Sequence, residues 1–152
     1  KLCKAFEILD KTKVCLIVAG DGELYLELKQ SYPDVIWLGA VEHKKVIQLL
    51  SETDIYVLPT DYPEGFPTAT LEAAMCGCCI ITTCAGTEEL ICDSSYGILM
   101  KENSISEIKE ELEKLLKNPE KIRQMGERVQ IRVKSHFTWD VTIKRVIKEF
   151  NE

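Results

Sequence analysis

Residues 54–83, DIYVLPTDYPEGFPTATLEAAMCGCCIITT, have the pattern of a β–α–β unit. The apolar runs Ile55–Leu58 and Cys79–Thr82 predict two buried strands, and Thr68–Cys76 predicts the helix between them. A loop rich in turn residues, 59–67, follows the first strand. Open α/β sheets bind ligands at the carboxyl edge of their strands, where backbone amides and helix N-termini meet. This loop is therefore the predicted place of a binding site.

Two acidic residues mark the stretch, Glu64 in the loop and Glu72 one turn into the helix. Thr68 is the expected N-cap, with the first-turn amides and the positive end of the helix dipole above the loop. Glu72 is not the acid of a capping box, because residue 69 is alanine where the box needs Ser or Thr. A carboxylate here can accept two hydrogen bonds from a vicinal diol. The alternative is that both acids are ordinary surface residues favoured by the dipole.

The same helix is expected to direct an apolar side toward the sheet. Glu72 follows Leu71 by about 100° around the helix, and we expect it to face a ligand cleft at the loop. The side chains expected to face the sheet are Leu71, Ala74 and Met75. Other elements predicted from periodicity are a short amphipathic helix within 1–13, a fully buried parallel strand over 14–20, and a strand within 35–41. Helices are expected over about 23–30, 42–51, 106–116, 119–135 and 139–150, and a last short strand over 96–100.

The segment EGFPTATLEA, starting at Glu64, resembles the E-x7-E signature of retaining nucleotide-sugar glycosyltransferases of the large family-four type. The following helix (AAMCG), strand (CCIIT) and loop (TTCAGTEEL) continue the pattern of that family, with Gly86 and Glu89 on its loop glycine and glutamate. The chain departs from the family where Ala85 replaces a glycine, Glu88 replaces a proline, and Pro67 replaces a glycine. None of these changes removes a polar side chain that the family uses.

The resemblance implies a GT-B protein, which has two Rossmann-like halves. Residues 1–152 then form the carboxyl-terminal, nucleotide-sugar-binding half, a three-layer α/β domain with a mainly parallel sheet flanked by helices. The domain is expected to be truncated at its amino end, and the amino-terminal, acceptor-binding half to be absent. The turn that carries the family's basic pair for the donor diphosphate is missing too, and Lys1 does not match that pair.

The resemblance also assigns roles to single residues. Glu64 is the expected catalytic residue, contacting the hydroxyls of the transferred sugar, and Glu72 accepts from the ribose diol. The expected substrate-binding residues are Gly65, Phe66, Pro67 and Thr68, which meet sugar and phosphate, Gly20 and Gly22, which border the donor, and Gly39 and Val41, which hold the nucleobase. Two of these have alternatives: Phe66 anchoring the loop in the core, and Gly20–Asp21–Gly22 as a tight turn without a ligand.

The expected reaction is transfer of a hexosyl group, with retention, from a nucleoside-diphosphate sugar to an acceptor glycan or lipid-linked sugar in glycan or polysaccharide synthesis. Family members generally need neither a metal nor a cofactor. Without the other half, we expect this chain to bind donor weakly and to be inactive. The alternatives are a non-catalytic α/β interaction module, a sugar-nucleotide epimerase, or an α-glucan phosphorylase-like GT-B enzyme, which would need a pyridoxal-phosphate lysine.

Composition limits the partners. The net charge of −6 and the lack of a Lys/Arg stripe argue against nucleic acid as the main partner. No apolar run reaches 18 residues. The seven cysteines are expected to be reduced and to pack as small apolar residues in a cytoplasmic protein, since C-x-C-C is not a zinc spacing. Assembly of glycans at the cytoplasmic face of a membrane is typical of the family.

Two expectations concern the ends of helices. His43 lies in a charged first turn and is expected to be solvated surface. The last helix, with Thr138 as its expected N-cap, has an apolar side made of Trp139, Ile143, Val146 and Ile147. In the family a similar helix crosses back onto the amino-terminal half, which would leave this side uncovered here. The alternative is that it packs within this domain.

Overall fold

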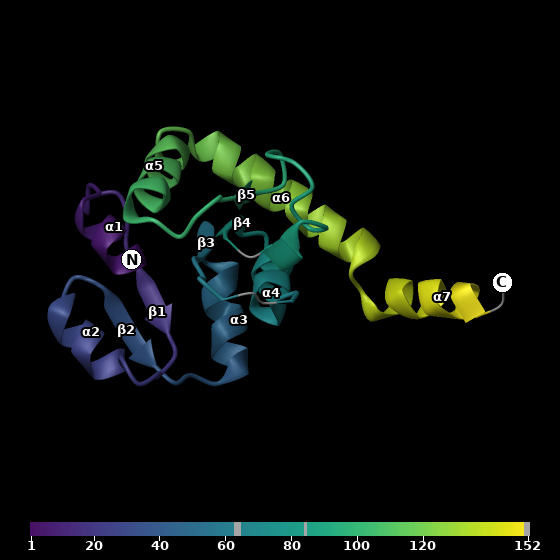
Figure 1. Ribbon diagram of the computed structural model, residues 1–152, viewed down its shortest axis with the longest axis horizontal. Helices are drawn as coiled ribbons and strands as arrows, with labels where there is room; N and C mark the ends of the chain where they lie inside the picture. Colours follow the sequence, from purple (N-terminus) through teal and green to yellow (C-terminus); the bar gives the residue numbers. More distant parts are fainter. Residues whose placement is uncertain (63–64, 84, 151–152) are drawn as a thin grey trace.

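The computed structural model describes residues 1–62, 65–83 and 85–150 (Figure 1). All strand pairs among these residues are parallel, and the strands form two sheets. One sheet joins β1 (Ile17–Ala19) to β2 (Ile36–Gly39), and the other has the order β3 (Ile55–Leu58), β4 (Cys79–Thr82), β5 (Ile98–Leu99). The helices are α1 (Leu2–Glu7), α2 (Tyr25–Ser31), α3 (His43–Ser51), α4 (Thr68–Cys76), α5 (Ile105–Leu116), α6 (Pro119–His136) and α7 (Trp139–Phe150), with a 3-10 turn at Ala85–Thr87.

The core lies on both faces of β4, whose residues are all buried. Alternate residues of a strand point to opposite faces, so Cys79 and Ile81 enter one apolar cluster and Ile80 enters the other. The first cluster is covered by α1, α5 and the start of α6, and the second by α3, α4 and the end of α6. Helices thus cover both faces of a parallel sheet, which confirms the predicted three-layer α/β, Rossmann-like fold.

The β–α–β unit predicted around the loop is confirmed, with β3, α4 and β4 at the predicted bounds. The expected N-cap is wrong: Thr68 is the first helical residue, and Pro67 is the N-cap. Pro67 has extended backbone, and its carbonyl accepts from the amide of Thr70 at 3.1 Å. An N-cap residue has non-helical backbone while its carbonyl accepts the first bond of the helix, so the helix begins directly after Pro67 without a side-chain cap.

The buried side of α4 also differs from the prediction. Met75 is 36% exposed, whereas Thr70 and Ala73 are completely buried beside Ala74. The helix contacts α3 and α6 as well as the strands. Its buried side is therefore centred on its smallest residues, which allow close approach, and the longer Met75 lies outside this contact.

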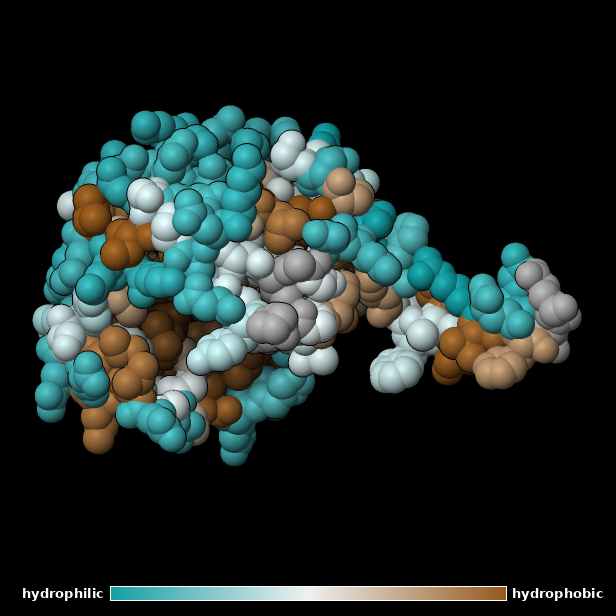
Figure 2. Space-filling view, viewed as in Figure 1, coloured by the Kyte–Doolittle hydropathy of each residue, from teal (hydrophilic) through white to brown (hydrophobic). Residues whose placement is uncertain are grey.

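The prediction of a fully buried strand over 14–20 is wrong. Only Ile17–Ala19 form β1, and Ile17 is 40% exposed. The physical reason is that β1 pairs with β2 alone among the described residues, so no second strand flanks its other edge. Apolar surface accordingly gathers around β1, β2 and α2 (Figure 2).

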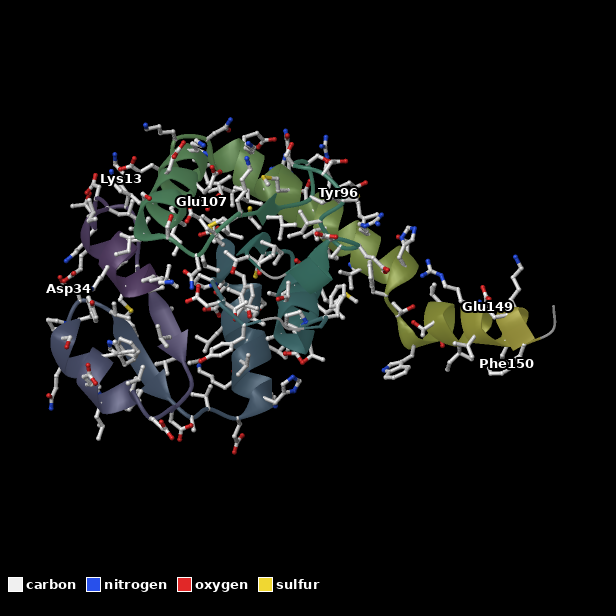
Figure 3. All side chains as sticks on the ribbon, viewed as in Figure 1. Lys13, Asp34, Tyr96, Glu107, Glu149 and Phe150 are labelled. Carbon is white, nitrogen blue, oxygen red and sulfur yellow. The ribbon has the colours of Figure 1, made fainter. Side chains whose placement is uncertain are left out.

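The last helix has no buried residue and extends away from the rest of the molecule (Figure 1). Glu149 and Phe150 lie at its far end (Figure 3), and Phe150 is 87% exposed. Trp139 is 81% exposed at the other end. The sequence analysis gave two alternatives for the apolar side of the last helix. The structure shows the alternative in which this side is not covered by the domain.

Candidate functional site

The predicted site lies where the parallel strands end. Strand pairs are parallel within each sheet, so the segments after β1 and β2 leave one edge of their sheet together, and those after β3 and β4 leave one edge of theirs. Glu64, the expected catalytic residue, lies outside the described residues, as do Pro63 and Cys84. The site is therefore built from the residues on either side.

Glu72 carries the one predicted site carboxylate that the structure describes. Its Oε1 atom is 2.9 Å from Nε2 of His43, and its side chain is 34% exposed. His43 is the first residue of α3, so the contact joins the start of α3 to the second turn of α4. The carboxylate is thus held beside the first residue of α3 and remains partly open to solvent.

The sequence analysis missed the role of His43. Its side chain is exposed, as expected, yet it is a partner of Glu72. The signal that could have found it is topological. Helices that follow parallel strands all begin at the same edge, so the first turns of two packed helices come together there.

The start of α4 offers backbone donors. The amides of Thr70 and Leu71 both point at the carbonyl of Pro67, at 3.1 and 3.4 Å. Among the described residues, none accepts a hydrogen bond from the amides of Thr68 and Ala69. Unpaired first-turn amides and the helix dipole together favour an anion at this place.

Phe66 has a packing role. Its ring lies 5.3 Å from the ring of Phe137, and it packs against the apolar cluster beneath α4. This agrees with the alternative in which Phe66 anchors the loop.

Gly20 and Gly39 fasten the loops after β1 and β2 to each other. The amide of Gly20 donates to the carbonyl of Gly39 at 2.7 Å. Both have positive φ, 136° and 66°, which favours glycine. The amide of Gly20 therefore already has an acceptor within the protein.

The two other residues predicted for these loops are Gly22 and Val41. Gly22 has open space around it, and the half-buried Val41 precedes the N-cap of α3.

The loop after β3 is held from two sides. The hydroxyl of Thr83 donates to the carbonyl of Thr60 at 2.7 Å and accepts from its amide at 2.8 Å. The side-chain amide of Asn103 donates to the carbonyl of Pro59 at 3.2 Å. These contacts, which the sequence analysis did not predict, fix the start of the loop that leads to Glu64.

Two residues named from the resemblance lie beside β4. Gly86 is within the 3-10 turn, and the carbonyl of Glu89 accepts from Nε of Arg132 at 3.0 Å. The guanidinium of Arg132 also lies over the ring of Tyr96. Contacts from α6 thus hold the chain that leaves β4.

The cysteines of β4 behave as core residues. Cys79 is completely buried, as is Cys78 just before the strand, and the thiol of Cys78 donates to the carbonyl of Leu50 at 3.2 Å. Burial raises the pKa of each thiol to about 12. The prediction that they pack as small apolar residues is confirmed for these two. Within the described residues, no three His, Cys, Asp or Glu side chains lie together as metal ligands.

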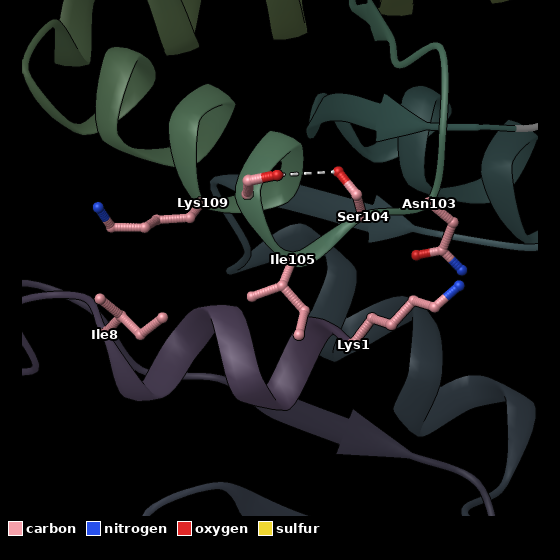
Figure 4. A pocket seen from close by; sticks show the side chains of 7 residues that line it. Lys1, Ile8, Asn103, Ser104, Ile105 and Lys109 are labelled. Carbon is pink, nitrogen blue, oxygen red and sulfur yellow. Dashed lines mark hydrogen bonds between the residues drawn. The ribbon is translucent and has the colours of Figure 1, made fainter.

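A hollow of about 570 Å³ lies between α1 and the start of α5 (Figure 4). Lys1 and Asn103 line it, together with Ile8, Ser104, Ile105, Ser106 and Lys109. The ammonium of Lys1 also lies 2.8 Å from the carboxylate of Asp61, which follows β3. None of the predicted site residues lines this hollow, so it is separate from the predicted site.

Solved structures with this fold are GT-B glycosyltransferases. Anabaena HepE in complex with UDP-glucose superposes with a TM-score of 0.82 and 23% identity, over 98% of this chain and 43% of that one. The fold is therefore that of one Rossmann-like half of such an enzyme.

Sequence comparisons agree with this fold. The family model for glycosyl transferases group 1 matches residues 1–132, and the chain belongs to this family. It is 32% identical over 146 residues to an uncharacterized glycosyltransferase of Methanocaldococcus jannaschii, covering 92% of this chain and 37% of that protein. It is also 38% identical over 90 residues to N,N'-diacetylbacillosaminyl-diphospho-undecaprenol alpha-1,3-N-acetylgalactosaminyltransferase of Campylobacter jejuni, covering 59% of this chain and 23% of that protein. The chain thus spans well under half the length of these relatives.

No helix among the described residues has the length and apolarity needed to cross a membrane.

Proposed function

We propose that this chain is the donor-binding half of a retaining glycosyltransferase, which moves a hexosyl group from a nucleoside-diphosphate sugar to an acceptor. The observation that carries the proposal is Glu72, a partly exposed carboxylate that lies one turn along α4 from two amides, of Thr68 and Ala69, which have no acceptor among the described residues. A carboxylate accepts hydrogen bonds from a ribose diol, and helix amides bind the adjacent phosphates. One nucleoside diphosphate contains both groups.

The remaining assignments follow from that position. The diphosphate lies against the amides of Thr68 and Ala69, and Glu72 receives the ribose hydroxyls. The loops after β1 and β2, with Gly22 and Val41, border the base. Glu64 contacts the transferred sugar. Support comes from the family and from the UDP-glucose bound to HepE, a protein of the same fold.

The acceptor is proposed to be a glycan or lipid-linked sugar, and its binding site to lie on the other half of the protein. The Campylobacter relative, whose name gives it an undecaprenol-linked acceptor, supports this class. We propose a cytoplasmic enzyme acting at the cytoplasmic face of a membrane. We also propose that it needs no bound metal, since helix N-terminal amides can take part of the diphosphate charge.

Titration with UDP, GDP and their sugars, followed by NMR of the chain, tests the donor site. We expect chemical-shift changes at His43, Thr68, Ala69 and Glu72. Glu72→Gln should weaken binding of the nucleoside diphosphate roughly tenfold, because a hydrogen bond to a charged group contributes about 1.5–3 kcal/mol and one between neutral groups about 0.5–1.5 kcal/mol. The matched control is Glu149→Gln at the far end of α7 (Figure 3), which should change nothing.

Glu64→Ala should mainly alter discrimination between sugars, leaving UDP binding unchanged. Equal loss of UDP binding in Glu64→Ala and Glu72→Ala would contradict this division of roles. Shift changes confined to residues away from α4, or none at millimolar ligand, would contradict the site itself.

A further inference from the structure

A second, smaller pocket of about 200 Å³ lies between α6 and the turn that precedes β5. The residues that line it are Ser94 and Ser95 from the turn and Lys121, Gln124, Met125 and Arg128 from α6. Met125 is buried in the core beneath the helix, so the other lining side chains are all polar or basic. Tyr96, the residue after the turn, also lies beside α6 (Figure 3).

The spacing of residues in α6 places the polar lining side chains on one side of the helix. Lys121, Gln124 and Arg128 follow one another at intervals of three and four residues. Lys121 and Arg128 are two turns apart, about 10 Å along the helix axis. Both side chains are long and flexible, so both can reach a group that lies over Gln124.

Both cations of this pocket are available to a ligand. Lys121 and Arg128 are exposed, and within the part of the chain that the structure describes neither has a hydrogen bond or an ion pair. In the hollow between α1 and α5, by contrast, Lys1 and Lys109 each contact a carboxylate, at 2.8 and 3.2 Å. The pocket beside α6 therefore differs from the larger hollow in having unpaired charge.

The turn contributes one free hydroxyl and lies beside one negative charge. The amide of Ser95 donates to the carboxylate of Asp93 at 2.7 Å, and the hydroxyl of Ser95 is bonded to the same carboxylate. These bonds lower the pKa of Asp93, and Arg128 and Arg132 lower it further. The hydroxyl of Ser94 has no such bond to a described residue, so it can donate to a ligand. Three basic side chains near one carboxylate leave the pocket positively charged.

The distribution of charge along the chain agrees with an anion site on α6. Residues 114–150 hold ten of the nineteen Lys and Arg residues and only four of the twenty-five acidic residues. All four arginines of the chain lie on α6 and α7, at Arg123, Arg128, Arg132 and Arg145. An anion is therefore attracted to these helices, although the whole chain has a net charge of −6.

We propose that this pocket binds one phosphoryl group, carried by a small phosphate monoester or by the phosphate headgroup of a lipid. The guanidinium fork of Arg128 fits two oxygens of such a group, the ammonium of Lys121 supplies a second charge, and Ser94 donates from its hydroxyl. A phosphate monoester has a charge of about −1.5 to −2 at pH 7, which matches two free cations better than the single charge of a carboxylate.

The size of the pocket suits this group. Because one water takes about 30 Å³ in the liquid, about 200 Å³ accommodates a phosphoryl group together with some of its waters.

The pocket is separate from the proposed donor site. Its turn leads into β5, which is parallel to β4, so it approaches the sheet from the amino edge. Glu72 and the amides of Thr68 and Ala69 belong to the segment after β3, at the carboxyl edge. None of these residues lines the pocket. The proposal therefore does not depend on the proposed function.

Titration of the chain with sodium phosphate at constant ionic strength, followed by NMR, tests the pocket. We expect saturable shift changes at the amides of Ser94 and Ser95 and at the Nε–H group of Arg128. Arg128→Gln and Lys121→Gln should each weaken binding roughly tenfold, because each removes a charged donor. Lys134→Gln is the matched control, since it removes the same charge from an exposed position of α6 outside the pocket and should change binding less than about twofold.

Two further probes identify what carries the phosphoryl group. Glycerol 3-phosphate represents a small monoester, and phosphatidylcholine vesicles that contain phosphatidic acid represent a lipid headgroup, with pure phosphatidylcholine vesicles as the control. Vesicle binding that is lost in Arg128→Gln supports a lipid headgroup. Saturable binding of the soluble ester without vesicle binding supports a small monoester.

Absence of saturable shift changes at Ser94 and Ser95 with both phosphate and glycerol 3-phosphate would overturn the proposal. So would equal binding by the unaltered chain and by the double variant Arg128→Gln/Lys121→Gln. Glu72→Gln should leave phosphate binding at Ser94 unchanged while it weakens binding of the nucleoside diphosphate. Failure at one site is thus distinguishable from failure at the other.

Discussion

At the scale of single residues, the contact between His43 and Glu72 decides how the candidate site is arranged. The two side chains are 71% and 34% exposed, so their contact adds little to stability. Its effect is to restrict the rotamers of Glu72 at the start of α4. A carboxylate that is already oriented loses less conformational entropy when a ligand binds.

His43→Ala should therefore weaken binding of the nucleoside diphosphate by a few-fold, with the melting temperature unchanged. Calorimetric titration with UDP, alongside thermal unfolding, measures both. His136→Ala is the matched control, since His136 bonds within its own helix at the end of α6. Unchanged affinity in His43→Ala would show that His43 does not position Glu72.

At the scale of elements, α6 crosses closely over the end of α4. Gly77 ends α4 in a left-handed conformation with φ of 90°. Gly126 of α6 lies directly against it, and a Cβ at Gly126 would overlap the carbonyl oxygen of Gly77. The neighbouring Gln130 donates to the carbonyl of Met75 at 2.8 Å. These contacts hold α4, and with it Glu72, against the rest of the domain.

Gly126→Ala should destabilise the protein by about 2 kcal/mol or more, because the overlapped atom belongs to the backbone and cannot move aside. This reverses the usual gain of up to about 1 kcal/mol for Gly→Ala within a helix. Urea unfolding measures the difference. Gly22→Ala, with nothing within 4 Å of its Cβ, is the control and should change stability by less than about 0.5 kcal/mol.

The buried thiols at β4 make stability depend on pH. In the folded protein the pKa of Cys78 and of Cys79 is raised by burial from 9.0 to about 12. Above pH 9 the unfolded chain loses these protons and the folded protein keeps them. Stability is therefore complete below about pH 9 and falls between pH 9 and 12.

The double variant Cys78→Ala/Cys79→Ala should show a shallower fall in the free energy of unfolding over this pH range, measured by urea unfolding. Cys15→Ala/Cys92→Ala removes two exposed thiols and should leave the slope unchanged. If the core double variant kept the full slope, the buried thiols would not be its source.

At the scale of the whole molecule, two apolar surfaces have no cover from the described residues. One lies around β1, β2 and α2, and the other is the apolar side of α7 (Figure 2). By the resemblance, α7 is expected to lie on the amino-terminal half of the protein. The body of the domain does not depend on α7, because this helix has no buried residue.

Removal of residues 139–152 should leave the cooperative unfolding of the domain unchanged within about 0.5 kcal/mol. It should also lower binding of the dye ANS, since the side chains of Trp139 and Phe150 are lost. Thermal unfolding and dye fluorescence check the two effects. A large loss of stability would mean that α7 packs on the domain in solution.

The sequence by itself determined the β–α–β unit around the loop, the parallel α/β class and the family. These depend on short-range signals: apolar runs of strand length, helical spacing, and turn residues between them. It also predicted that Glu72 lies one turn into a helix, because helix bounds and spacing place that residue without knowledge of distant contacts.

Tertiary structure decided what depends on residues far apart in the sequence. It paired His43 with Glu72, turned Met75 outward and Thr70 inward, and set Gly126 against Gly77. It also left Ile17 exposed, because burial of a strand depends on its neighbours in the sheet and not on its own apolar residues. Periodicity fixes which residues share a face, but only the packing of whole elements decides which face is covered and which side chains meet.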